Sequence, residues 1–197
     1  MRRSSGAAFV RWVKSVVPVF GESEVVAIDG KTSRRSGKVG ATPLLLVSAF
    51  ATGAGWVLGS GATAAKSNEK TAIPELLVTL ALEGCLVTID AMRTQPNIPR
   101  AIRDRGADYA LAVKDNQPTL AESIRDYFEA FQAAPAKTPH HGNETIKKNH
   151  GRIEVRRCQV FDPLDGLHAP QRWRHLKPFA VVTASSDPLR AKVLGLV

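Results

Sequence analysis

The sequence predicts an α/β fold in which a mixed sheet, made of three antiparallel strands followed by βαβ units, carries helices on its faces. Two observations lead to this prediction. Short apolar runs bounded by turn residues come first, and then alternate with longer segments whose apolar residues have helical spacing. In addition, 197 residues with 44% hydrophobic content can bury the core of one domain. The longest apolar run is far shorter than the roughly 20 residues of a membrane span, so no membrane partner is predicted.

The N-terminal part is predicted to contain a short helix and a meander of three strands. Residues 7–17 have apolar positions at helical spacing, whereas residues 25–29 form a short apolar run that ends at Asp29. Two further apolar runs, residues 44–52 and 55–64, meet at a Gly-Ala-Gly turn, which is typical of a hairpin.

The middle of the chain predicts two βα units. Residues 67–84 run from capping residues to a glycine and predict a helix, provided that Pro74 lies in its first turn. The apolar run "CLVTID", residues 85–90, predicts a buried strand that again ends on an aspartate. Residues 95–106 are a weaker helix candidate with two prolines, and residues 107–117 predict a fifth strand followed by a polar turn.

The C-terminal third predicts a helix, a polar segment and a β-rich end. Residues 118–132 have the clearest helical periodicity in the chain. Residues 133–150 are rich in Pro, Gly, His and Lys, and we expect a flexible basic linker there. Residues 152–162 and 179–185 are then predicted to form strands.

The two strands that end in an aspartate are predicted to lie side by side. A right-handed crossover through the helix after the third strand returns the fourth strand parallel to the first. Asp29 and Asp90 would then meet at one sheet edge, where their charges repel unless a cation binds between them. Carboxylates select Mg²⁺ or Mn²⁺, and two such ions can activate a nucleophile and stabilise a leaving oxygen in phosphoryl transfer. The alternative interpretation is that each aspartate only serves the turn after its strand.

The charge distribution favours a polyanionic partner. The net charge is +9, distributed as +6 over residues 1–66, −3 over residues 67–144 and +6 over residues 145–197. Two basic flanks around a slightly acidic middle favour a nucleic acid held around a site that has its own negative charge. The alternative is a basic surface without a ligand.

Cysteine content and the N-terminus bear on the cellular compartment. Cys85 and Cys158 are too few and too far apart for a disulfide framework or a zinc site. The N-terminal stretch lacks a signal-peptide pattern, because Arg11 and Lys14 interrupt its apolar residues. A cytoplasmic location is therefore expected.

Several segments resemble one known family. In chain order they are "VVAIDGKTSRRSG", "LLLVSAFATGAGWVLG", "KSNEKTAIPELL", "LEGCLVTIDAM", "IRDRGADYALAVKDNQPTL" and "HGRIEVRRCQVFD". The chain is similar in this region to bacterial insertion-sequence transposases of the H-repeat-associated (ISAs-one) group, members of the DDE superfamily. The resemblance implies an RNase H-like catalytic fold, with Asp29 and Asp90 as the first two catalytic acids and ligands of Mg²⁺ or Mn²⁺. It also implies transposition of double-stranded DNA through terminal inverted repeats, homo-oligomers, and association with the nucleoid when the protein is bound to DNA.

The chain also departs from that family. The third acid, a Glu in a His-Trp-x-Ile-Glu-Asn segment, has no counterpart here, and the region before the first acid is shorter than usual. We therefore expect a transposase truncated at both ends and inactive alone. The expected organisation is an N-terminal remnant with one helix (1–20), a partial catalytic core (21–132), the flexible basic linker (133–150) and a partial β-rich insertion with a divergent tail (151–197).

Basic and polar residues outside the apolar runs are expected to contact DNA phosphates, which gives affinity without sequence information. They are Lys31, Arg34, Arg35, Lys38, Lys114, Asn116, Gln117, Lys147, Lys148, Arg152, Arg156 and Arg157. The alternative interpretation is that they form solvated loops and surfaces or support the acidic site.

Three functions remain open from the sequence. The first is a transposase catalytic-domain fragment. The second is a complete metal-dependent nuclease in which Glu154 is the third acid, although an acid among arginines more often forms ion pairs than binds metal. The third is a non-catalytic DNA-binding or dimerising remnant.

Overall fold

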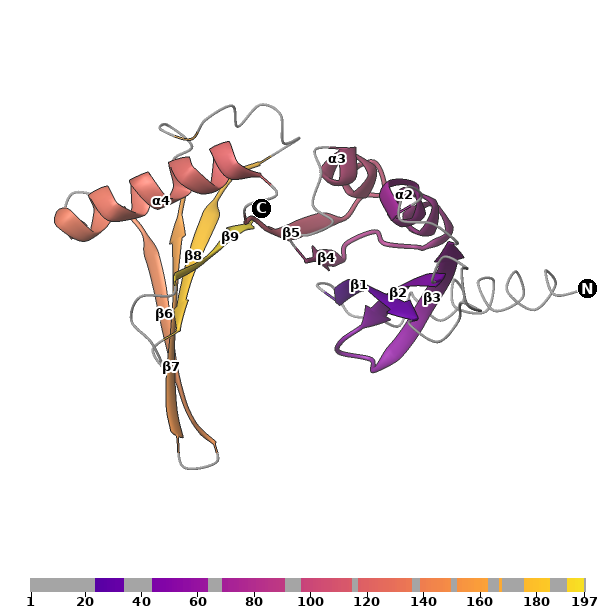
Figure 1. Ribbon diagram of the computed structural model, residues 1–197, viewed down its shortest axis with the longest axis horizontal. Helices are drawn as coiled ribbons and strands as arrows, with labels where there is room; N and C mark the ends of the chain where they lie inside the picture. Colours follow the sequence, from indigo (N-terminus) through magenta and orange to yellow (C-terminus); the bar gives the residue numbers. More distant parts are fainter. Residues whose placement is uncertain are drawn as a thin grey trace, which may run out of the picture. The chain divides into compact units, whose positions relative to one another are not determined.

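The computed structural model describes residues 24–33, 44–63, 69–90, 97–114, 117–135, 139–149, 152–162, 167, 176–184 and 191–196. The chain divides into two compact units, Met1–Tyr109 and Ala110–Val197 (Figure 1). The predicted helix at residues 7–17 lies outside the described residues. Within the described stretches, no helix has the length and apolar character needed to cross a membrane.

The first unit contains a mixed sheet that begins with three antiparallel strands, as predicted (Figure 1). These strands are β1 (Val25–Ser33), β2 (Leu44–Ala51) and β3 (Trp56–Thr63). Gly55 closes the β2–β3 turn with a φ of 74°, a conformation that residues with a Cβ rarely adopt. Its N–H donates to the Ala51 carbonyl at 2.9 Å. The predicted hairpin is therefore confirmed.

Two further strands extend this sheet. β4 (Leu86–Ile89) returns parallel to β1, so the spatial order β3-β2-β1-β4 is the one that the predicted crossover requires. β5 (Asp108–Ala112) begins beside β4, where the Asp108 N–H donates to the Cys85 carbonyl at 2.9 Å. The mixed α/β architecture predicted from the sequence is confirmed for this unit.

One face of the sheet is covered by α2 (Glu69–Thr79), which contacts β2, β3 and α3 (Asn97–Arg103) (Figure 1). Gly59 on β3 marks a close approach, because a Cβ there would stand 3.2 Å from the Leu80 side chain and 3.3 Å from that of Leu76. Apolar residues of the sheet and the two helices form the core: Val26, Ile28, Val47, Ala49, Val87, Ile89, Ile73, Leu76, Leu77, Ile98 and Ile102.

Pro74 lies inside α2 rather than in its first turn, so that expectation was wrong. Its missing N–H removes one helical hydrogen bond, and its ring crowds the preceding turn. Ile73 is 1% exposed and Leu77 is 0% exposed, however, so the helix buries apolar side chains on both sides of the proline. This burial against the sheet stabilises the helix despite the lost hydrogen bond.

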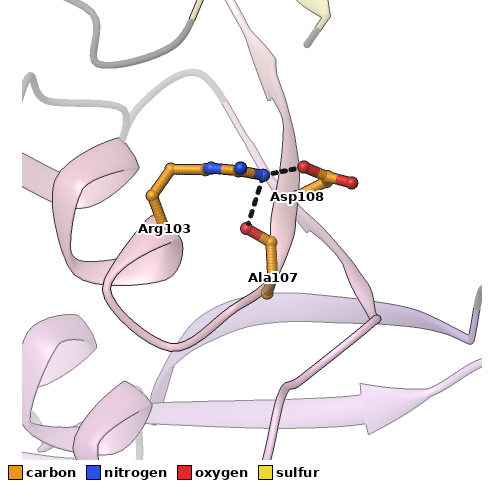
Figure 2. Close-up of polar contacts among 3 residues, drawn as sticks. All are labelled: Arg103, Ala107 and Asp108. Atoms are coloured by element: carbon orange, nitrogen blue, oxygen red, sulfur yellow. Dashed lines mark hydrogen bonds and ion pairs between the residues drawn. The ribbon is translucent and has the colours of Figure 1, made fainter.

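Arg103, the last residue of α3, holds the connection to β5 (Figure 2). Its Nη1 donates to the Ala107 carbonyl at 3.2 Å and forms an ion pair with Asp108. The Arg103 side chain is 29% exposed, so the pair is less screened than a fully exposed one. The adjacent Tyr109 is buried, and this burial raises the pKa of Tyr109 to about 12 although the charge of Arg103 opposes the rise.

The second unit is an antiparallel sheet crossed by one long helix, α4 (Pro118–Ala133) (Figure 1). The residues of β5 from Ala110 onward pair with β9, and the order continues through β8 and β7 to β6. These strands are β6 (His141–Asn149), β7 (Arg152–Phe161), β8 (Phe179–Ala184) and β9 (Ala191–Leu196). α4 begins with proline, where a missing N–H is harmless, and it matches the predicted helix closely.

Two segments of this unit differ from their predictions. The flexible linker predicted at residues 133–150 is wrong over residues 141–149, which form β6 and pair along their length with β7. Residues 191–196, in the predicted divergent tail, form β9 and pair with both β5 and β8. β6 was missed because residues 141–148 are all exposed and so show no apolar alternation. The predicted domain boundaries stay predictions.

An aromatic cluster joins α4 to this sheet. Phe161 on β7 and Phe179 on β8 are both 0% exposed, and their ring centroids are 5.2 Å apart. From α4, Tyr127 and Phe131 meet Phe161 edge-on at centroid distances of 5.4 Å and 5.0 Å. Pairs of this kind contribute about 0.5–1.5 kcal/mol each beyond the burial of apolar area. The cluster therefore anchors the helix to one face of the sheet.

Candidate functional site

Asp29 lies in the middle of β1. The predicted strand end at Asp29 is wrong, because β1 continues to Ser33 in register with β2. Burial alternates along the strand: Val26 and Ile28 are buried under the helices, whereas Asp29 is exposed. The Gly30 N–H donates to Asp29 Oδ1 at 2.8 Å. Asp29 therefore stands on the sheet face opposite to α2, on a backbone held by β2.

Asp90 is the residue directly after β4, and it too is exposed. β1 and β4 pair in parallel with Ile28 opposite Ile89, so Asp29 and Asp90 each come one residue later on neighbouring strands. Opposite residues of paired strands share a face, and adjacent strands lie about 4.8 Å apart. The predicted parallel pairing of the two strands that lead to Asp29 and Asp90 is confirmed, whereas the meeting of the two side chains and their catalytic role stay predictions.

Two serines, which the sequence analysis missed, extend the acidic pair across the sheet. Ser48 on β2 stands opposite Asp29, and Ser60 on β3 stands opposite Ser48. A polar row thus crosses β1, β2 and β3 on the face away from α2: Asp29, Ser48 and Ser60. Asp90 follows the neighbouring strand β4. The signal that could have found the serines is a single hydroxyl residue inside each of the apolar runs "LLLVSAF" and "WVLGSGA".

The two carboxylates suit a hard divalent cation. Proteins commonly bind Mg²⁺ through one or two carboxylates, with waters and substrate phosphates completing the coordination shell. Asp29 and Asp90 fit this pattern because they offer oxygen ligands from adjacent strands. Over the residues that the structure describes, no group of three His, Cys, Asp or Glu side chains could hold a metal ion. The third acid implied by the family resemblance is therefore not found beside the pair in these stretches.

Glu154, the candidate for that third acid, lies on β7 in the second unit. Its Oε1 accepts a hydrogen bond from Arg156 Nε at 2.9 Å and lies 2.8 Å from Arg156 Nη2. On the neighbouring strand, Glu144 Oε2 accepts from Arg157 Nε at 2.5 Å. Both acids are thus engaged by arginines, which is what the basic surroundings favour.

The predicted DNA-binding residues fall in three places. Lys31 is exposed on β1, two positions after Asp29 and on the same face. Lys114 is exposed after β5, and its carbonyl accepts the Gln117 N–H at 2.9 Å in the turn before α4. The strands β6 and β7 carry Lys147, Lys148, Arg156 and Arg157. Outside the described residues lie Arg34, Arg35, Lys38, Asn116 and the side chain of Arg152.

Comparison with known proteins identifies the family. Residues 20–188 match the model of the transposase DDE domain. The chain belongs to this family. It is 42% identical over 150 residues to the "Putative transposase YncI" of Escherichia coli (strain K12), a match that covers 75% of this chain and 59% of that protein. It is 37% identical over 182 residues to the "H repeat-associated putative transposase YhhI" of the same strain, covering 89% and 47%.

These DDE relatives confirm the resemblance to H-repeat-associated transposases that the sequence motifs predicted. An "Uncharacterized protein in dhlA 3'region" of Xanthobacter autotrophicus is 36% identical over 182 residues, covering 92% of this chain and 61% of that protein. The chain spans 47–61% of the length of these three relatives. Among solved structures, a piggyBac transposase synaptic complex with hairpin DNA aligns with a TM-score of 0.40 and 10% identity, covering 83% of this chain and 33% of that one.

Proposed function

We propose that this chain carries part of the catalytic centre of a DNA transposase, with Asp29 and Asp90 as metal ligands on an RNase H-like sheet. The observation that carries the proposal is the parallel pairing of β1 with β4, which brings the two acids together. Membership of the transposase DDE domain family supports the same reaction class. A bound divalent cation, Mg²⁺ or Mn²⁺, supplies activation of a water or 3′-hydroxyl nucleophile and stabilisation of the leaving oxygen.

The protein's own groups position the DNA in this proposal. Asp29 and Asp90 would supply the cation-binding oxygens from two strands that lie about 4.8 Å apart. Lys31 stands on the same face, two residues or about 6.6 Å farther along β1, where its ammonium neutralises a phosphate beside the reacting one. The proposed partner is double-stranded DNA at the ends of a mobile element, bound by a homo-oligomer in the bacterial nucleoid.

We propose that the third acid of the centre is supplied from outside this chain, so that the chain alone does not carry out strand transfer. Glu154 is the competing candidate, and its use would make the chain a complete nuclease. The ion pair with Arg156 disfavours this, because a carboxylate held by a guanidinium must lose that partner before it binds a cation. A purely DNA-binding or dimerising role is the remaining alternative.

Metal-linked stability tests the acidic pair without requiring activity. A ligand at 100 times its Kd stabilises the folded state by about 2.7 kcal/mol. Mn²⁺ or Mg²⁺ titrated into the chain should therefore raise the unfolding temperature of the unaltered protein and of the control Glu154→Gln. Asp29→Asn and Asp90→Asn should each lower metal affinity at least about tenfold, because each removes a ligand. Equal metal responses in all four proteins would refute the site.

A strand-cleavage assay separates the complete nuclease from the transposase fragment and the DNA-binding remnant. A labelled duplex that contains an inverted repeat is incubated with the chain and Mg²⁺, and binding is followed as the salt concentration rises. The proposal expects salt-sensitive binding without cutting by the chain alone. Cutting that disappears in Glu154→Gln would establish the nuclease instead, and salt-insensitive or absent binding would refute DNA as the partner.

A further inference from the structure

The outer part of the β6–β7 hairpin is a two-stranded ribbon. We define the distal ribbon as residues 144–148 of β6 and 153–157 of β7, which pair with Ile146 opposite Val155 and Lys148 opposite Ile153. On its other side β7 pairs with β8 only from Arg156 onward, so the strand before Arg156 has β6 as its one partner in the described part of the sheet. Figure 1 shows the hairpin continuing away from α4.

The distal ribbon exposes apolar side chains on one face. Ile146 is 65% exposed and Ile153 is 62% exposed, more than any other large apolar residue that the structure describes. The same face of β7 is fully buried against α4 at Phe161, where the exposed fraction is 0%. On this face Arg157 and Gln159 separate Phe161 from Val155 and Ile153, so the exposed isoleucines form a patch of their own beyond the reach of the helix. An exposed apolar patch rimmed by polar residues marks a site of interaction.

The same ribbon has a surplus of positive charge. Residues 144–148 and 153–157 together contain four basic and two acidic residues. Both acids are already paired, Glu154 with Arg156 and Glu144 with Arg157. The lysines Lys147 and Lys148 are exposed and occupy adjacent positions, so they stand on opposite faces of the ribbon. A partner of this surface must therefore accept apolar contact on one face and offer negative charge close to Lys147 and Lys148 of β6.

We propose that the distal ribbon enters the major groove of duplex DNA, with Ile146 and Ile153 against thymine methyl groups and Lys147 and Lys148 on flanking phosphates. This inference rests on the proposed DNA-binding function and adds its mode of contact. The major groove is about 12 Å wide and admits a two-stranded ribbon, and thymine offers it a methyl group for apolar contact. A second copy of this chain is disfavoured because ribbon packed on ribbon would bring the lysines of the two copies together.

Replacing thymine by uracil tests the apolar contact on the unaltered protein. Two 30-base-pair duplexes of alternating sequence are compared, one made of A·T pairs only and the other of A·U pairs only. They have the same charge and differ in the thymine methyl group, which lies in the major groove. One buried methyl group corresponds to about a fourfold change in affinity. The protein should bind the uracil duplex at least about fourfold more weakly in an anisotropy titration, and equal affinities would overturn the inference.

Variants then assign the effect to the ribbon. Ile146→Ser/Ile153→Ser should bind both duplexes equally, whereas the control Val57→Ser, at a residue 48% exposed on β3, should keep the methyl preference. Lys147→Ala/Lys148→Ala should weaken binding to both duplexes and lower the salt slope by about 2. A methyl preference that survives in the isoleucine variant would overturn the assignment.

Two further outcomes separate this inference from its competitors. If the isoleucine variant loses self-association in sedimentation while its DNA binding is unchanged, the distal ribbon binds a second copy of this chain rather than DNA. The inference then fails. Asp29→Asn should keep the methyl preference, because the ribbon and the acidic pair belong to different units. Failure of the unaltered protein to bind either duplex would instead refute the proposed DNA-binding function itself.

Discussion

Replacing Phe161 by alanine should destabilise the second unit selectively. The ring is fully buried, and five aromatic rings have centroids within 6.4 Å of its own: those of Tyr127, Phe128, Phe131, His140 and Phe179. Phe→Ala in a protein core costs about 3–5 kcal/mol through lost burial and the cavity left behind. Because helix and sheet meet at this ring, we expect the upper half of that range, about 4–5 kcal/mol. A loss of this size is a large part of the 5–15 kcal/mol that stabilises an ordinary domain.

Hydrogen exchange measured peptide by peptide is the appropriate assay, because it reports the two units separately. Phe161→Ala should accelerate exchange in α4, β7 and β8 while β1 and β4 keep their protection. Phe50→Ala is the matched control, since Phe50 is 39% exposed on β2 and its loss should cost about 1 kcal/mol. Unchanged protection in β7 and β8, or an equal loss in β1 and β4, would refute the reasoning.

Two further predictions concern titratable side chains. Because burial raises the pKa of Tyr109 to about 12, the unfolded chain releases the phenolic proton near pH 10 while the folded chain keeps it. The free energy of unfolding should therefore fall between pH 10 and 12, by at most about 2.7 kcal/mol from this group. Urea midpoints measured against pH should fall less steeply for Tyr109→Phe than for the unaltered protein. Parallel curves for the two proteins would contradict this prediction. Burial, and then the charge of Glu24, raise the pKa of the Cys85 thiol. Two variants each keep a single cysteine: Cys85→Ala keeps Cys158, and Cys158→Ala keeps Cys85. At pH 8 a thiol reagent should label the first variant faster than the second, and the reverse order would contradict the burial argument.

The first unit could largely be predicted from its sequence because its strands bury one face. Val26 and Ile28 on β1, and Val87 and Ile89 on β4, are apolar residues that the core requires, so their runs are visible in the sequence. Once these strands are recognised, the helix between β3 and β4 can serve as a right-handed crossover connection. Such a connection returns β4 parallel to β1, which is the pairing observed. The placement of the two acids on neighbouring strands followed from these two steps, whereas the strand end predicted at Asp29 was wrong.

The second unit resisted prediction because its outer strands are held by pairing rather than by burial. β6 gains its hydrogen bonds from β7 along residues 141–149, yet its side chains face solvent and obey no apolar period. Ser48 and Ser60 were missed for a related reason: their importance lies in register with Asp29, and register is a property of two strands together. Periodicity within one segment cannot reveal either feature.

The two aspartates looked alike in the sequence, but they stand on differently supported backbones. Asp29 lies inside β1 and is paired with Ser48 of β2, so the ladder holds the chain before and after it. Asp90 follows the last β1–β4 pair, Ile28 with Ile89, so that ladder holds it on one side only. A carboxylate on a strand interior is positioned more accurately than one at a strand exit. The paired backbone of β1 and β2 around Asp29 is therefore the part of the proposed site whose geometry the strand register fixes.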